Sequence, residues 1–228
     1  MPDEFRIEHE GPLPARPEQV WTAVTRDMGA WLMPSEPMSD TAIVWEPPRH
    51  CVSRQQDGEW FNQIEFSIED HESGSYIRYV HSGIFVDDWE NQYDGARRHT
   101  VFYLHNLGQY LRYFYGRPYR HVEVAAPPSS STADGLAPAR LALGIPDDLP
   151  VDTEIAVDLP AVGPTKVTVD YTDDAFVGLR ADDALYRFFG RNRFGLPVAV
   201  GAYQYGEQPV PLAEVEAAWS RWLTEVYA

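Results

Sequence analysis

The chain has 228 residues, 44% of them hydrophobic and 13% aromatic, which is enough to bury one large core or two small ones. Its 18 basic and 35 acidic residues give a net charge of −17. Such a surface repels phosphate backbones and anionic lipids, so we expect neither nucleic acid nor a membrane as a partner. No run approaches the about 18 apolar residues that a membrane helix needs, and residues 1–4 lack the pattern of a signal peptide. These features predict a cytoplasmic protein.

The first predicted elements are a strand and two short helices. Residues Phe5–His9 alternate apolar and polar side chains, as a half-exposed strand does. A helix led by Pro17 follows, because proline is tolerated in the first helical turn. Its apolar residues recur at helical spacing: Val20, Trp21 and Val24. Trp31 and Leu32 predict a second short helix before the next proline.

Four predicted strands come next, and the last two carry clear inward faces. The first three cover Thr41–Glu46, Cys51–Gln55 and Glu59–Glu69. Alternation places five residues of the third on one face: Trp60, Asn62, Ile64, Phe66 and Ile68. The fourth strand, Tyr76–His81, places Ile77, Tyr79 and His81 on one face.

A long aromatic-rich helix is predicted to close this sheet. Asp87 and Asp88 supply a cap where the chain turns helical, and the helix ends near Gly116. Its apolar residues include Val101, Leu104, Leu107, Leu111 and Phe114. A sheet laid down first and closed by one helix predicts a small cup that can hold an apolar ligand.

Residues 125–139, AAPPSSSTADGLAPA, consist almost wholly of small residues, serine and proline, and this composition predicts a linker. We therefore expect domains at 1–124 and 140–228. The second domain carries strands and a terminal helix: Lys166–Tyr171, Ala175–Leu179, Ala184–Phe189, Val198–Tyr205, and a stripe of Val215, Trp219, Trp222 and Val226. This order is an abbreviated copy of the first half, without its opening strand and short helices. The sheet edges then need cover from the first domain or from a second chain, as in a homodimer.

Several motifs favour ordinary structural roles. The single Cys51 is expected to be a buried thiol, since its neighbour His50 points to the opposite face of the strand. Paired aspartates such as Asp173 and Asp174 fall at turns. The arginines of Tyr186–Asn192 are expected to line an exposed strand edge, where they could bind an acidic group.

No metal is expected, because the histidines lack helical i, i+4 spacing and the sequence has no cysteine cluster. No cofactor is expected either, because no phosphate-binding glycine loop occurs.

The order of these landmarks is similar to that of a known family. The landmarks are Val20-Trp21 on a proline-led helix, Trp31-Leu32, and the segment Tyr76–Gly83 before a long helix. Residues 5 to 116 thereby resemble the activator-of-Hsp90-ATPase homologue 1-like family of the START-like (SRPBCC, helix-grip) superfamily. The family's Gly-Trp pair early in the final helix is replaced here by Val101-Phe102-Tyr103. The resemblance implies an α+β helix-grip fold, with an antiparallel sheet wrapped on a long helix and a cavity between them. It does not imply an Hsp90-type chaperone partner, because the extra N-terminal domain of the eukaryotic activators has no counterpart here.

A mostly apolar pocket with a few polar groups is typical of small-molecule sites. We expect nine cavity-lining residues: Trp60, Asn62, Ile64, Phe66, Tyr79, His81, His99, Tyr103 and Leu107. No catalytic residue is assigned, since a lone histidine on an apolar strand face is more often a core residue than a base. Three functions stay open: binding of an apolar or aromatic small molecule, a chaperone-linked or other protein-interaction module, and an enzyme that uses Asn62 and His81 on a polyketide-like or aromatic substrate.

Overall fold

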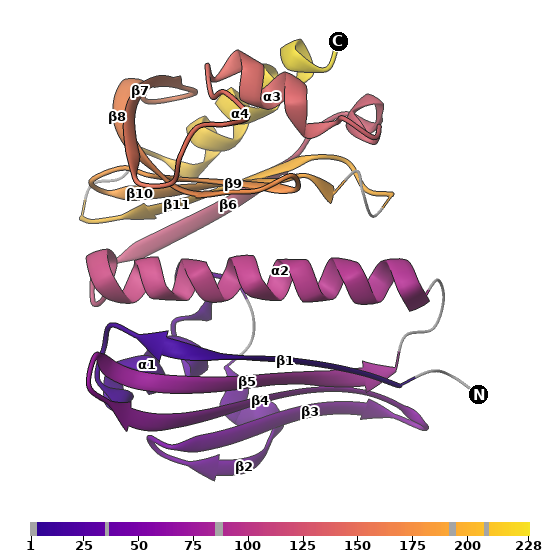
Figure 1. The fold of residues 1–228 in the computed structure, drawn as a ribbon, viewed down its shortest axis with the longest axis vertical. Helices are drawn as coiled ribbons and strands as arrows, with labels where there is room; N and C mark the ends of the chain where they lie inside the picture. The colour runs from indigo at the N-terminus through magenta and orange to yellow at the C-terminus, as the bar shows by residue number, and fades with distance from the viewer. Residues whose placement is uncertain (1–3, 35–36, 85–88, 192–194, 208–209) are drawn as a thin grey trace. The chain divides into compact units, whose positions relative to one another are not determined.

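The protein is described by a computed structural model that covers residues 4–34, 37–84, 89–191, 195–207 and 210–228. The chain divides into two compact units, residues 1–116 and residues 117–228 (Figure 1). Each unit combines one antiparallel sheet with a helix at its C-terminal end. The expected α+β class with antiparallel sheets is therefore confirmed.

Unit 1 contains one five-stranded sheet and two α-helices. Its elements run β1 (Glu4–Leu13), α1 (Pro17–Thr25), the 3-10 turns η1 (Met28–Ala30) and η2 (Met38–Thr41), β2 (Ala42–Glu46), β3 (His50–Asp57), β4 (Trp60–His71), β5 (Gly74–Ile84) and α2 (Trp89–Gln109), which continues as a π-helical turn, Tyr110–Phe114. The strands agree with those predicted from alternation. The second short helix is only the 3-10 turn η1, and it ends just before Trp31. The predicted cap at Asp87 and Asp88 lies outside the described residues.

The sheet of unit 1 has the order β1-β5-β4-β3-β2, with all neighbours antiparallel. The last strand, β5, thus pairs with the first, and α2 runs along one face of the sheet (Figure 1). The core between helix and sheet is apolar and fully buried, with contributions from Ile7, Phe66, Ile68, Phe102 and Leu107. Helix α1 contacts β4 and β5. The indole of Trp31 donates a hydrogen bond to Ala23 O at 3.0 Å, which fixes the chain after α1.

Unit 2 contains one six-stranded sheet and two α-helices. Its elements run β6 (Tyr119–Ala125), η4 (Pro128–Ser130), α3 (Leu136–Ala142), β7 (Thr153–Leu159), β8 (Gly163–Thr172), β9 (Phe176–Arg180), β10 (Ala184–Phe189), β11 (Ala199–Tyr205) and α4 (Leu212–Val226). Figure 1 shows α3 and α4 on the same face of this sheet. The predicted stripe on α4 is present, with Val215 and Trp219 fully buried.

Residues 125–139 are not a linker. They hold η4 and the start of α3, and Ser130, Leu136 and Ala139 are buried in unit 2. The hydroxyl of Ser130 accepts a hydrogen bond from Val198 N at 3.0 Å, and Ser129 donates one to Tyr227 O at 2.8 Å. Small residues occur here because the segment packs closely against β11 and the end of α4, so composition alone gave the wrong interpretation.

Unit 2 is also not an abbreviated copy. Its sheet order is β6-β11-β10-β9-β8-β7, so the last strand again pairs with the first, and all neighbours are antiparallel. Strand β6 is an opening strand and α3 is a short helix, two elements that the sequence analysis predicted to be missing from the second half. Both units therefore follow one topology, with one more strand in unit 2. The truncated sheet that motivated a covering homodimer is absent from the described part of unit 2.

Arg187, the first of the two arginines of Tyr186–Asn192, does not line an exposed edge. Strand β10 lies between β9 and β11, and Arg187 is 0% exposed. Its guanidinium donates two hydrogen bonds to Asp170, Nη1 to Oδ1 at 2.8 Å and Nη2 to Oδ2 at 2.7 Å. A Cβ on Gly178 would lie 2.7 Å from Arg187 Nη1, so glycine leaves the space that this ion pair needs.

Within the residues described, no helix is long and apolar enough to cross a membrane.

Candidate functional site

The inner face of the unit 1 sheet is built by strand alternation. Residues directly opposite each other on paired strands share a face. The register therefore places Ser53, Ile64 and His81 in one row across β3, β4 and β5. The adjacent rows bring Gln55 opposite Asn62, and Phe66 opposite Tyr79. Polar residues are thus concentrated toward one end of this face, while apolar and aromatic residues fill the middle.

A cavity of about 230 Å³ opens at the polar end of this face. Two methionines and Ile64 form its apolar wall, and four uncharged polar side chains form the rest. Its lining residues are Met28, Met38, Thr41, Ser53, Gln55, Asn62 and Ile64. The hydroxyls of Thr41 and Ser53 are hydrogen-bonded to each other. The cavity therefore combines an apolar wall with neutral hydrogen-bonding groups, as small-molecule sites usually do.

A smaller cavity of about 50 Å³ lies between the sheet and α2. Its lining is aromatic and aliphatic except for one threonine: Met28, Trp31, Leu32, Ile64, Phe66, Tyr79, Thr100, Tyr103 and Leu104. Met28 and Ile64 line both cavities, so the two spaces lie on either side of these two side chains. Both side chains can change rotamer, methionine most easily because it has three rotatable side-chain bonds.

His81 and Asn62 form a hydrogen-bonded pair at the end of the larger cavity. His81 Nε2 lies 2.6 Å from Asn62 Oδ1. Burial lowers the pKa of His81 to about 4, so the imidazole is neutral near pH 7. Since a carboxamide oxygen only accepts, Nε2 carries the proton and donates it to Asn62. The ring of Phe5 packs edge-on against His81 at a centroid distance of 4.8 Å and holds it in place.

Two other ionisable side chains of this face are held in their neutral forms. Burial raises the pKa of Tyr79 well above its usual range, although its hydrogen bond with Thr100 partly opposes the shift. Burial also raises the pKa of the Cys51 thiol to about 12, and Cys51 is fully buried, as expected from the sequence. A thiol with that pKa is almost entirely protonated near pH 7 and is a poor nucleophile.

Five of the nine expected site residues line a cavity. Asn62 lines the larger one, Ile64 lines both, and the smaller one is lined by Phe66, Tyr79 and Tyr103. The other four lie elsewhere. His81 stands behind Asn62, and Leu107 is fully buried in the core. Trp60 is 37% exposed at the start of β4, and the Nδ1 of His99 donates to Gly95 O at 2.7 Å within α2.

Sequence reasoning missed several lining residues, although some carried a usable signal. Ser53 and Gln55 alternate with Cys51 on β3, so the period of two already placed them on the inner face. Thr100 lies one turn before the lining residues of α2. Met28 and Met38 could not be found this way, because they belong to the irregular turns η1 and η2.

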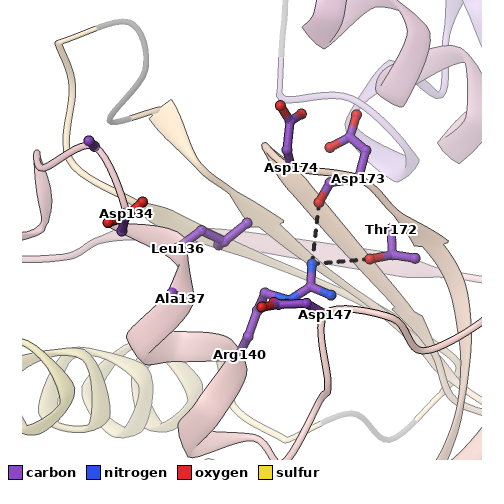
Figure 2. Close-up of a pocket in the computed structure, with 9 residues that line it drawn as sticks. Asp134, Leu136, Ala137, Arg140, Asp147, Thr172, Asp173 and Asp174 are labelled. Carbon is purple, nitrogen blue, oxygen red and sulfur yellow. Dashed lines mark hydrogen bonds and ion pairs between the residues drawn. The ribbon is translucent and has the colours of Figure 1, made fainter.

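Unit 2 contains a larger hollow beside α3, about 660 Å³ in volume and lined by four aspartates around Arg140 (Figure 2). The two terminal nitrogens of the Arg140 guanidinium are hydrogen-bonded within unit 2. Nη1 donates to Thr172 Oγ1 at 3.1 Å and to Asp173 O at 3.2 Å, and Nη2 donates to Pro146 O at 3.0 Å. Nε forms an ion pair with Asp147 at 3.0 Å, without hydrogen-bond geometry.

These contacts explain the hollow as an anchor for α3. Arg140 is buried and ties the helix to the turn after β8, while Asp173 Oδ1 accepts hydrogen bonds from Ala175 N at 2.8 Å and Phe176 N at 2.7 Å. Asp173 thus caps a turn, as expected for the paired aspartates. In the described part of the chain, no three His, Cys, Asp or Glu side chains are placed to hold a metal ion. The contacts of Arg140 and Asp173 are thus structural, so we place the candidate site in unit 1.

Comparison with known proteins gives structural likenesses only. No protein-family model and no curated protein matches the chain. Among solved structures, the Aha1 dimer from Colwellia psychrerythraea is similar at 17% identity over 47% of this chain and 96% of its own, with a TM-score of 0.40. Protein MLL2253 from Mesorhizobium loti is similar at 19% identity over 46% of this chain and 95% of its own, with a TM-score of 0.38.

DynU16, a protein of the dynemicin biosynthetic locus, is similar over both units. It covers 97% of this chain and 96% of its own at 13% identity, with a TM-score of 0.39. TM-scores below 0.5 and identities below 20% establish neither a family nor a function for the chain.

Proposed function

We propose that unit 1 binds a small, mainly apolar molecule in the space between its sheet, η1 and α2. The observation that carries this proposal is the pair of neighbouring cavities that share Met28 and Ile64 as lining residues. One cavity is lined by neutral polar groups and the other by aromatic rings. A molecule in the larger cavity would bury its apolar part against Ile64 and the two methionines, and each buried CH₂ contributes about 0.8 kcal/mol.

The volume limits the size of this ligand. An apolar cavity of about 150 Å³ binds benzene, whereas drug-sized ligands occupy about 300–1,000 Å³. The larger cavity measures about 230 Å³, and the neighbouring one adds about 50 Å³. We therefore expect a ligand with one ring and a short substituent, or a short acyl chain, rather than a polycyclic molecule.

The ionisation states of the inner face support binding rather than acid–base catalysis. A general acid or base works best with a pKa near the working pH. Here the pKa of His81 is about 4 and that of Cys51 about 12, and neither side chain lines the two cavities described above. The enzyme hypothesis required Asn62 and His81 to face a substrate together, whereas of these two only Asn62 lines the larger cavity.

The test is calorimetric titration of the full chain with ethylbenzene, compared between two serine-to-leucine variants. Ser53→Leu puts a larger side chain into the 230 Å³ cavity, whereas Ser67→Leu makes the same change on the opposite face of the neighbouring strand β4. We expect saturable binding to the wild type, at least a tenfold weaker affinity for Ser53→Leu, and an unchanged affinity for Ser67→Leu. The tenfold loss corresponds to about 1.4 kcal/mol.

Two results would contradict the proposal. One is the absence of saturable binding to the wild-type chain by ethylbenzene, toluene and short acyl compounds alike. The other is an equal loss of affinity in the two variants, because a general loss of stability would then explain it.

A further inference from the structure

The amide of Asn62 has a fixed orientation at the larger cavity. Its oxygen accepts the hydrogen bond from His81 Nε2 at 2.6 Å, and a neutral imidazole with its proton on Nε2 can only donate there. The Asn62 Nδ2 amide group therefore points away from His81. No described residue accepts a hydrogen bond from Asn62 Nδ2, although Asn62 lines the cavity.

The surroundings of His81 hold its imidazole ring in place. On β5, Gly83 lies opposite Asn62, and a Cβ there would meet Phe61 O at 2.7 Å and Phe5 Cε1 at 2.9 Å. The absence of that Cβ lets the Phe5 ring lie against His81. With the Nε2–H···Oδ1 hydrogen bond that the structure shows, rotating the Asn62 amide would place its Nδ2 against the Nε2 proton, so a reversed amide requires the tautomer protonated on Nδ1.

The other polar groups of the cavity are compatible with a neutral acceptor. The hydroxyls of Thr41 and Ser53 share one hydrogen bond, which leaves one of their two protons available as a donor. No lining residue carries a charge. An anionic ligand group would lose its hydration here without gaining a cationic partner, which is costly.

We infer that the molecule bound by unit 1 carries a neutral carbonyl group, an aldehyde, ketone, ester or amide, whose oxygen accepts a hydrogen bond from Asn62 Nδ2. Its apolar body then lies against Met28 and Ile64. This inference rests on the proposed function and adds the chemical class and orientation of the ligand. His81 acts as a positioning residue, since it fixes the amide without facing the ligand.

The inference is tested with two probes of nearly equal shape, acetophenone and ethylbenzene, which differ in whether a carbonyl or a CH₂ group joins the methyl to the ring. One net hydrogen bond is worth about 3- to 10-fold in affinity, so we expect acetophenone to bind the full chain that much more tightly. Asn62→Leu is expected to abolish this preference, so that the ratio of the two affinities falls to about one whatever the affinity for ethylbenzene becomes. Gln63→Leu, the same change one residue later on the outer face of β4, is expected to leave both affinities unchanged.

Two further measurements keep the test independent of the stability of Asn62→Leu. In NMR spectra of the wild type, the side-chain amide resonances of Asn62 should shift strongly with acetophenone and weakly with ethylbenzene. His81→Phe, which removes the donor that orients the amide, should reduce the preference for acetophenone but not the affinity for ethylbenzene.

The outcomes separate the two proposals. Equal affinities for both probes, a preference that persists in Asn62→Leu, or amide resonances that do not respond to acetophenone would overturn the carbonyl inference and leave the binding function intact. Binding of neither probe would overturn the proposed function itself.

Discussion

The two units follow one topology but fill their inner faces differently. In both, a first strand pairs with the last, short helical segments follow, and a helix ends the unit. On β10 of unit 2, Tyr186 and Phe188 meet Trp219 of α4 at ring distances of 5.9 and 5.7 Å, within one continuous apolar core. On β4 of unit 1, the corresponding face carries Asn62 and borders a cavity.

This difference shows that the topology by itself does not produce a binding site. The sheet and helix of either unit could enclose a space, and side-chain size decides whether that space is filled. Large aromatic residues close it in unit 2. Methionine, serine and asparagine leave it open in unit 1. The predictions that follow alter one unit at a time, from the largest expected effect to the smallest.

The largest effect is expected from Trp219→Ala, which would open unit 2. Trp219 is 0% exposed and contacts Trp222 at a ring distance of 5.3 Å. Removing a fully buried tryptophan costs about 3–5 kcal/mol, because the transfer free energy is lost and a cavity remains. Urea unfolding followed by circular dichroism measures the change. The matched control is Trp222→Ala, which should cost clearly less because Trp222 is only partly buried. Equal losses would show that the core of unit 2 is not centred on Trp219.

Acid should weaken both units through one buried histidine in each. Burial lowers the pKa of His81 and of His121 to about 4, against about 6.5 in the unfolded chain. Between these values the unfolded state binds the proton and the folded state does not, so stability falls as the pH falls from about 6.5 to 4. The full loss is about 3 kcal/mol per histidine, of which about half should be present at pH 5.5.

The pH dependence can be assigned to each unit by substitution. The free energy of unfolding, measured in urea at pH 7 and 5.5, should become less pH-dependent in His81→Gln and in His121→Gln. The pH range from 7 to 5.5 lies above the usual pKa values of aspartate and glutamate, so these residues contribute little to the change in stability. Unchanged pH dependence in both variants would show that these imidazoles stay protonatable in the folded chain.

The smallest effect is expected at Trp60, an aromatic residue of the same β4 face that lines neither cavity. It is 37% exposed, so Trp60→Ala should change the affinity for ethylbenzene by less than about twofold, within the scatter of surface substitutions. A loss of tenfold or more in titration would extend the site to the start of β4.

The fold of unit 1 was largely predictable because its strands alternate strictly. The predicted strand Glu59–Glu69 is β4, Trp60–His71, and its inner residues were assigned to the correct face. Register follows from the same alternation, since one face is buried. Four cavity-lining residues on β4 and β5 were assigned to the inner face in this way: Asn62, Ile64, Phe66 and Tyr79. The methionines were missed, because irregular turns have no period.

The fold of unit 2 was less predictable for identifiable reasons. Strand β6, Tyr119–Ala125, alternates apolar and polar residues only over its last few positions, from Val122 on, which is a short signal. Pro138 within α3 argued against a helix there. Arg187 reads as a surface residue, because its partner Asp170 is 17 positions away on another strand. A buried ion pair depends on the pairing of strands, which local patterns do not contain.

The central claim is that unit 1 has an accessible ligand space between its sheet and helices, whereas side chains fill the corresponding space of unit 2. Methyl-resolved NMR of the full chain during a titration with ethylbenzene tests it most directly. We expect saturable shifts for the methyl groups of Met28 and Ile64, which line both cavities, and constant positions for Val177 and Leu179 in the core of unit 2. Static resonances at Ile64, or larger shifts at Leu179 than at Ile64, would contradict the claim.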